Sequence, residues 1–139
     1  MSDFDFEEMN KQVVEEFRAN DGKVGGHFEN MPVCLLHTTG AKSGKERINP
    51  ACPWVEGDDF YIFASMAGAP RNPDWYYNLK VNPEVEVEWG TESFKAEAVE
   101  VTGSERDRIY AAMAAAHQNF AEYEQQTDRT IPVVALKRR

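Results

Sequence analysis

The chain has 139 residues, of which 42% are hydrophobic and 28% charged, and this balance suits one domain around one core. Its net charge of -9 argues against binding to nucleic acid or to an anionic membrane, except through a local basic patch. No apolar run approaches the roughly 20 residues that span a bilayer, and the acidic start is unlike a signal peptide. We therefore expect a soluble, cytoplasmic domain covering residues 1–139.

The first thirty residues, 1–30, predict a helix followed by a loop. Over residues 5–19, apolar side chains recur at spacings of three and four, which indicates one apolar helical face: Phe6, Met9, Val13 and Phe17. Asn20, Asp21 and Gly22 end the helix. Two roles are open for it, a packed N-terminal helix and a lid over a pocket.

Three apolar segments, 33–39, 47–55 and 60–65, predict strands that follow one another as a meander. Pro50 and Pro53 each remove a backbone donor from the middle segment. That segment is therefore expected at an edge, with a bulge, or interrupted.

A short helix is predicted next, with Pro73 as its first residue and Asn72 as its cap. It runs through Lys80. Residues 85–89 then alternate valine or tryptophan with glutamate, which predicts a strand with one wet face, and residues 94–98 form its partner, extending towards Val101.

A second long helix is predicted from Ser104, with Asp107 as a capping-box acid, and Phe120 and Tyr123 lie near its end or just beyond. Residues 130–136 form the closing strand. About six strands joined mainly by hairpins favour an α+β protein, with a mostly antiparallel sheet curled into a small barrel and helices at its side.

The segment 40–47 is the first candidate site. Lys42, Lys45 and Arg47 place three cations on one turn of an acidic chain, and Ser43 adds a hydroxyl. The turn's glycines expose backbone amides, so the group suits a phosphate or a string of carboxylates. It is not a Walker P-loop. A solvated, lysine-rich hairpin is the alternative.

Two further segments follow. The small residues of 64–70 leave room for a flat ring against the backbone, although an ordinary strand-to-helix connection explains them as well. In segment 72–83, Trp75 and Leu79 are expected in the core, and Asn78 caps the helix or ties loops together.

The usual catalytic groupings are missing. The histidines have no ligand spacing and are expected to be structural: His27, His37 and His117. Cys34 and Cys52 are expected to be small buried hydrophobes, and no metal site is predicted. An enzyme without reactive groups of its own borrows them from a cofactor.

The order of these segments resembles a known family. Residues 35–44 (LLHTTGAKSG), 64–70 (ASMAGAP), 72–83 (NPDWYYNLKVNP) and 129–133 (RTIPV) are similar to the deazaflavin-dependent oxidoreductases of the nitroreductase type, found mainly in actinobacteria. The resemblance covers roughly residues 33–136. The pair of motifs Thr-Gly-x-Lys-Ser-Gly and Asn-Pro-x-Trp-x-x-Asn-Leu-x-x-Asn-Pro, at this spacing, is specific.

This resemblance implies a split β-barrel like that of flavin reductases and pyridoxamine-phosphate oxidases, forming a single deazaflavin-binding domain. It also implies coenzyme F420, a deazaflavin with a phosphate and an oligoglutamate tail, which three cations would suit. The implied cofactor-binding residues lie on the three segments: Lys42, Ser43, Gly44, Lys45, Arg47, Asn49, Pro50, Ala64, Ser65, Met66, Ala67, Gly68, Ala69, Trp75 and Asn78. Family members often have a basic residue where this chain has Ala41, and many have lysine at Met66.

The activity implied is hydride transfer from reduced deazaflavin to an apolar, electron-poor acceptor: a quinone, a nitroaromatic or an activated enone. Tyr123 is the catalytic candidate, as a proton donor or orienter or as a wall of the substrate pocket, and plain packing in the core is the alternative. Quinone access allows peripheral contact with a membrane, and the oligomeric state is open. The alternatives are an FMN-binding reductase on the same barrel and a non-catalytic carrier of a cofactor or lipid.

Overall fold

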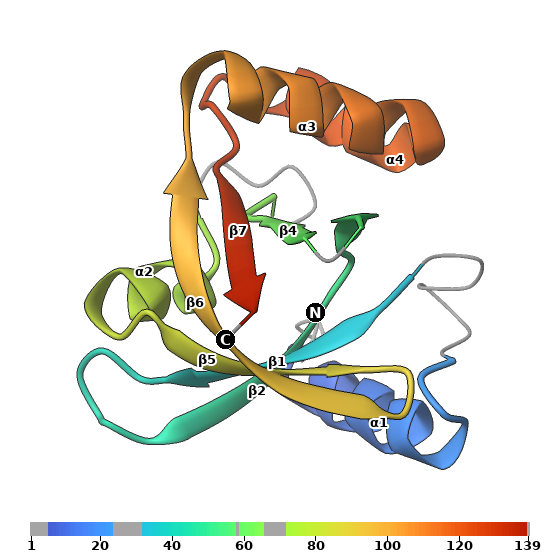
Figure 1. Cartoon of the computed structure of the whole chain (residues 1–139), viewed down its shortest axis with the longest axis vertical. Coiled ribbons are helices and arrows are strands. Elements are labelled where there is room, and N and C mark those ends of the chain that lie inside the picture. Colours follow the sequence, from blue (N-terminus) through green and yellow to red (C-terminus); the bar gives the residue numbers. More distant parts are fainter. Residues whose placement is uncertain (1–5, 24–31, 58, 66–71, 139) are drawn as a thin grey trace, which may run out of the picture.

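The computed structural model describes residues 6–23, 32–57, 59–65 and 72–138, and the side chains of residues 6–10 are not described. Its elements, in chain order, are α1 (Phe6–Ala19), β1 (Cys34–Thr39), β2 (Glu46–Ala51), β3 (Trp54–Glu56), β4 (Asp59–Phe63), α2 (Asp74–Val81), β5 (Glu84–Trp89), β6 (Glu92–Val101), α3 (Gly103–Ala116), α4 (Gln118–Gln126) and β7 (Val133–Arg138). Figure 1 shows how they are arranged. No helix of the described residues is long and apolar enough to cross a membrane.

The strands of the described residues form one antiparallel sheet in the order β2-β1-β5-β6-β7-β4-β3. The two edge strands, β2 and β3, are joined in the chain by only Cys52 and Pro53. The sheet therefore curls until its two edges are close. In Figure 1, β1, β2 and β5 run across the view while β7 and the end of β6 stand upright. The expected curled antiparallel barrel with flanking helices is confirmed.

The predicted strand 47–55 is interrupted, which is one of the outcomes that its prolines indicated. Pro50 lies in the edge strand β2, where a missing donor disturbs no second neighbour, and Pro53 lies in the link. The two pairings of the predicted meander are confirmed, but its middle segment is divided between two strands at opposite edges of the sheet. The chain makes a β1–β2 hairpin at one edge, crosses through the link, and makes a β3–β4 hairpin at the other edge.

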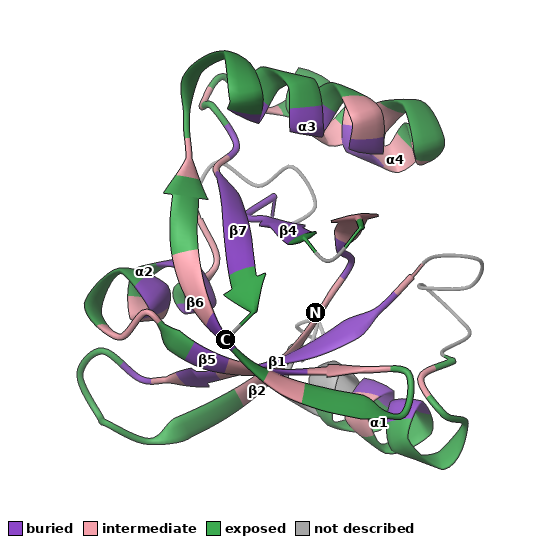
Figure 2. Cartoon of the chain, in the orientation of Figure 1, coloured by how far each residue is buried: buried purple, intermediate pink, exposed green. Residues whose placement is uncertain are grey.

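Side chains alternate between the two faces of a strand, so the sheet supports two hydrophobic clusters. One, the α2 cluster, packs against α2: Cys34, Leu36, Phe60, Ile62, Ala64, Trp75, Tyr76, Leu79, Val85, Val87, Ala96, Val134 and Leu136. The other, the α3–α4 cluster, gathers beneath the last two helices and reaches α1: Phe17, Val33, Leu35, Cys52, Tyr61, Phe63, Ile109, Tyr110, Met113, Phe120, Ile131, Val133 and Ala135. Figure 2 shows that β7, which contributes to both, is buried over most of its length.

Helix α1 is a packed element of the described structure. Val13 and Phe17 are buried, and Phe17 belongs to the α3–α4 cluster. Gly22 ends the helix with φ of 94° and donates its N–H to the carbonyl of Phe17 at 2.8 Å. A Cβ on Gly22 would lie 2.7 Å from the Cα of Gly90, so the chain approaches the β5–β6 turn closely there. The side chains of Phe6 and Met9 lie outside the described set.

Two helix predictions need correction. Pro73 is the N-cap of α2, and Asn72 does not cap it, because the Oδ1 atom of Asn72 accepts a hydrogen bond from Arg129. The long helix after Ser104 is two helices, which meet at an extended His117 (φ -136°, ψ 103°).

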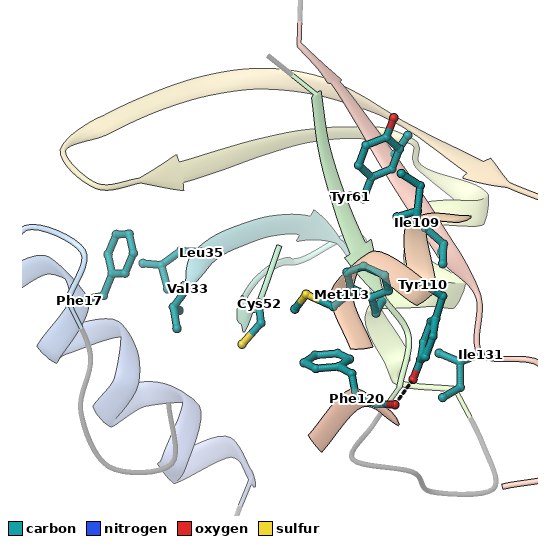
Figure 3. Packing of buried hydrophobic residues seen from close by; sticks show 13 residues of the cluster. Phe17, Val33, Leu35, Cys52, Tyr61, Ile109, Tyr110, Met113, Phe120 and Ile131 are labelled. Carbon is teal, nitrogen blue, oxygen red and sulfur yellow. Dashed lines mark hydrogen bonds between the residues drawn. The ribbon is translucent and has the colours of Figure 1, made fainter. Parts of the chain in front are cut away.

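This break places α4 against α3. The phenol of Tyr110 donates to the carbonyl of Phe120 at 2.6 Å, as Figure 3 shows. The capping-box prediction for Asp107 is also wrong, because the cap of α3 has no side-chain hydrogen bond and Asp107 pairs with Arg106 at 3.1 Å.

Candidate functional site

The turn between β1 and β2 is closed by its own backbone. The N–H of Gly40 donates to the carbonyl of Lys45 at 2.8 Å, and the N–H of Gly44 donates to the carbonyl of Gly40 at 3.0 Å. Gly44 has φ of 69°, where glycine is favoured. The Oγ atom of Ser43 accepts from the N–H of Lys45 at 3.2 Å. The Ser43 hydroxyl can therefore accept from the turn while donating its own proton outward.

Helix α2 holds this turn in place through two asparagines. The Oδ1 atom of Asn78 accepts from the N–H of Ala41 at 2.9 Å, so the prediction that Asn78 ties loops together is confirmed. Asn82 donates to the carbonyl of Thr39 at 3.3 Å. Asn82, the C-cap residue of α2, is not among the predicted site residues, although it is an asparagine only four positions after Asn78.

The three cations of the turn are exposed. Within the described residues, none of Lys42, Lys45 and Arg47 takes part in a salt bridge, whereas other cations, such as Arg18 and Lys80, are paired with carboxylates at 2.8 Å. Residues 40–47 are called the basic turn below. The one carboxylate of the turn, Glu46, lies 3.6 Å from the His37 ring. Exposed cations without a carboxylate partner are available to an anion from outside.

The β1–β2 register decides the face on which each β2 residue lies. Residues opposite each other in an antiparallel pair share a face. Asn49 pairs with Leu36, and Leu36 belongs to the α2 cluster, so Asn49 and Arg47 lie on that face of the sheet. Pro50 alternates to the other face, with Ile48, which packs against the α3–α4 cluster.

The second predicted segment begins at the end of β4. Ala64 and Ser65 are buried, and Ala64 shares the α2 cluster with the buried Trp75, so this part of the segment packs against α2. The remaining predicted residues of the segment lie outside the described residues: Met66, Ala67, Gly68 and Ala69.

Arg129, which was not predicted as a site residue, links the end of β4 to Asn72, just before α2. Its Nη2 atom donates to the carbonyls of Ala64 at 3.1 Å and Ser65 at 3.0 Å, and its Nη1 atom donates to Oδ1 of Asn72 at 2.6 Å. Burial lowers the pKa of the guanidinium from its ordinary value. The available signal was an arginine directly before an apolar closing strand.

Tyr123 lies on α4 and is half-buried. Its ring packs edge-to-face on Phe120, with centroids 5.3 Å apart, and Phe120 packs on Phe63, with centroids 5.5 Å apart. Phe63 is the last residue of β4 and directly precedes Ala64. The amide of Asn119 donates to the Tyr123 oxygen at 3.2 Å. Tyr123 is thus connected to the end of β4 through aromatic contacts.

The described histidine and cysteines of the first strands have structural surroundings. His37 bonds to Glu88, which also accepts from Arg18 of α1 at 2.8 Å, and Glu46 lies 3.6 Å from the other ring nitrogen of His37. Cys34 and Cys52 are free and buried, as predicted. Burial raises the pKa of both thiols, that of Cys52 to about 12, so neither favours the thiolate.

Comparison with known proteins agrees with this geometry. An F420H(2)-dependent quinone reductase of Mycobacterium tuberculosis (strain H37Rv) is 38% identical over 127 residues, which are 88% of this chain and 85% of the relative. A solved structure of an F420-H2 dependent reductase, FDR-A, matches with a TM-score of 0.71 and 38% identity over 81% of this chain and all of that chain.

A more distant match supports the fold alone. A Listeria innocua protein named for pyridoxamine 5'-phosphate oxidase matches with a TM-score of 0.56 at 11% identity, over 94% of this chain and 93% of that chain. The sheet is therefore the split β-barrel shared with that group. Residues 9–138 match the F420H(2)-dependent quinone reductase family, and the chain belongs to this family.

Proposed function

We propose that this protein binds coenzyme F420 and transfers a hydride from its reduced form to a quinone. The observation that carries the proposal is the basic turn, where Lys42, Lys45 and Arg47 are exposed and lack carboxylate partners among the described residues. The family and the relatives that match the chain are named for this cofactor.

The donor set of the turn fits the anionic part of the cofactor. A phosphate and a string of glutamates present several oxygens, and Lys42, Lys45 and Arg47 would each give charge-assisted hydrogen bonds to them. The Ser43 hydroxyl adds a neutral donor. The backbone N–H groups of Gly40 and Gly44, which were expected to be exposed, instead donate to carbonyls of the turn itself. Because Asn78 fixes Ala41 to α2, the turn is held before the ligand arrives, and less conformational entropy is lost on binding.

The flat part of the cofactor is proposed to lie at the end of β4. Ser65 would present its backbone N–H to the ring, together with the backbone of Met66, Ala67, Gly68 and Ala69. The N–H and carbonyl of Ala64 are occupied by Pro132 and Arg129, so Ala64 would contribute only the space that its small side chain leaves. Trp75 supports this position from α2, since it shares a cluster with Ala64. Gly44, Asn49 and Pro50 complete the proposed set on the β1–β2 hairpin.

When bound in its reduced form, the deazaflavin supplies the hydride. The protein's own contribution is to orient the acceptor and to exclude water. Tyr123 is proposed to face the acceptor from α4, where its phenol can shape an apolar wall or donate a proton to the reduced acceptor oxygen. The hydrogen bond from Asn119 leaves the phenol proton available for donation.

Quinones are the proposed physiological class, and nitroaromatics and activated enones are proposed as further electron-poor acceptors. We also propose that the protein works in the cytoplasm, with peripheral membrane contact where the quinone is lipid-dissolved.

The test uses the purified protein with reduced F420 and menadione, a small naphthoquinone. Oxidation of the cofactor is followed by the return of its absorbance, with nitrobenzene and cyclohexenone derivatives as comparison acceptors. We expect oxidation that depends on both protein and quinone. Tight F420 binding without any quinone-dependent oxidation would show a carrier, and turnover with FMN in place of F420 would show a flavin reductase.

A further inference from the structure

Arg129 lies in the connection between α4 and β7, and its guanidinium contacts both flanks of segment 66–71. On one flank it donates to the carbonyls of Ala64 and Ser65, and on the other it donates to the side chain of Asn72. Buried carbonyls need hydrogen-bond partners. The Arg129 side chain therefore supplies hydrogen bonds to the two carbonyls at the end of β4 and links them to Asn72.

This contact continues through α2 to the basic turn. Asn72 leads into α2, and Asn78 of the same helix accepts from the backbone of Ala41. A continuous path of covalent and hydrogen bonds thus runs from Ser65, through Arg129 and α2, to the turn. The two ends of this path are the two places where the proposed cofactor would be held.

We propose that Arg129 is a positioning residue of the reductase, which sets the distance and angle between the end of β4 and the basic turn. The inference rests on the proposed function, because the spacing matters for a ligand that reaches both places. Arginine suits the task because its planar fork donates to several acceptors in fixed directions, whereas lysine acts as a flexible point charge.

Arg106 provides a matched control. It too is an arginine that donates twice to the backbone, from Nε at 3.1 Å and Nη2 at 2.9 Å, to the carbonyl of Ile131. It also pairs with Asp107 at 3.1 Å and lies 3.6 Å from Glu124. These contacts fasten α3 to the segment before β7 and include no residue of α2 or β4. Loss of either guanidinium group should lower the stability of the fold, but only the loss of Arg129 should change the cofactor site.

The experiment compares Arg129→Lys with Arg106→Lys in the full chain. The readouts are the dissociation constant for F420, the kcat and KM with menadione, the thermal unfolding midpoint, and the hydrogen exchange of the Ala64 amide, which donates to the carbonyl of Pro132. We expect both variants to unfold earlier. Arg129→Lys alone should weaken F420 binding roughly 10- to 100-fold, and it should speed exchange at Ala64 without ligand more than Arg106→Lys does.

Two further variants separate positioning from general damage. Asn72→Asp keeps an acceptor for Arg129 and should retain F420 affinity, whereas Asn72→Leu removes the acceptor and should weaken binding in the same direction as Arg129→Lys. Equal F420 affinity in Arg129→Lys and the unmodified protein would overturn the inference. So would an equal loss in Arg106→Lys. If the unmodified protein does not bind F420, the proposed function fails, and unchanged Ala64 exchange in Arg129→Lys would then overturn the positioning role independently.

Discussion

Two groups of charged residues in this acidic protein have opposite surroundings. Arg18, His37 and two glutamates, Glu46 and Glu88, form a cluster that joins α1, β1, β2 and β5, in which the charge of Arg18 is compensated by Glu88 at 2.8 Å. The basic turn lies on the same hairpin but has three exposed cations with no salt bridge among the described residues. Charges that are paired within the protein, such as Arg18 and Glu88, support the fold. The three cations of the basic turn have no carboxylate partner in the described part of the chain and are available to a ligand.

The strongest way to break this comparison is to remove cations from the turn. Arg47→Ala or Lys42→Ala should each weaken F420 binding by about 1–3 kcal/mol, because each removes a charge-assisted contact. The unfolding midpoint should change little, since these side chains are exposed. Fluorescence titration with F420 measures the loss.

Arg138→Ala is the control for charge alone, because Arg138 is paired with Glu92 at 2.8 Å on the far strand β7. Its F420 affinity should match that of the unmodified protein. The same loss in Arg138→Ala and Arg47→Ala would mean that net charge, and no particular turn, decides binding.

Tyr123 carries no charge and is proposed to face the substrate, so its variants should change substrate use and leave cofactor binding unchanged. Tyr123→Ala should raise the KM for menadione about tenfold while F420 affinity stays the same, and Tyr123→Phe should be close to silent if the ring only shapes the pocket. Steady-state kinetics and an F420 titration of both variants test this. A fall in kcat of about 10²–10⁴ in Tyr123→Phe would instead assign proton donation to the phenol. A fall in F420 affinity alone would contradict the placement of α4.

Thr38 is a neutral polar group beside the basic turn. It pairs with Arg47 in the register, and its buried hydroxyl has no hydrogen-bond partner among the described residues. An unsatisfied buried hydroxyl is costly, so Thr38→Val should raise the free energy of unfolding by about 1 kcal/mol in chemical denaturation. A decrease in that free energy would show that the hydroxyl has a partner in the folded protein.

Glu88 gives the smallest effect, and it belongs to the compensated cluster. The hydrogen bond from Arg18 lowers the pKa of Glu88, and the bond to His37 acts in the same direction. A carboxylate with a lowered folded-state pKa stabilises the fold above its unfolded pKa of about 4.3, and this contribution is lost as the pH falls through the folded value.

Because Arg18 is half exposed, the pair should contribute only about 0.2–1 kcal/mol. Glu88→Gln should therefore flatten the pH dependence of unfolding between about pH 5 and pH 3, without affecting F420 binding at neutral pH. An unchanged pH profile would remove Glu88 from the stabilising cluster.

Much of this arrangement could be predicted from the sequence, where the signal is local. The alternation of residues 85–89 predicted a strand, and the apolar spacing of residues 5–19 predicted α1. The predicted meander gave the two hairpin pairings but not the crossing between sheet edges at Cys52 and Pro53. Which strands form the edges depends on pairings made by the whole sheet, so local sequence does not show it.

At the site too, features with a local sequence signal were predicted, and features that depend on distant residues were not. The basic turn was visible because its residues are consecutive, and Asn78 was expected to cap the helix or to tie loops together. Arg129 was missed because its acceptors, Ala64, Ser65 and Asn72, lie 57 to 65 positions earlier in the chain. The sequence suggested that the Asn72 side chain caps the following helix, but in the structure this side chain accepts a hydrogen bond from the distant Arg129.

The central claim is that the exposed cations of the basic turn hold the anionic tail of F420. The most direct test measures the affinity of two ligands for two proteins. F420 is compared with the same deazaflavin lacking the phosphate and glutamates, on the unmodified protein and on Lys42→Ala/Lys45→Ala/Arg47→Ala. In the unmodified protein F420 should bind more tightly than the tailless ligand, and this preference should disappear in the triple variant, whose affinity for the tailless ligand stays the same. A preference of equal size in both proteins would contradict the claim.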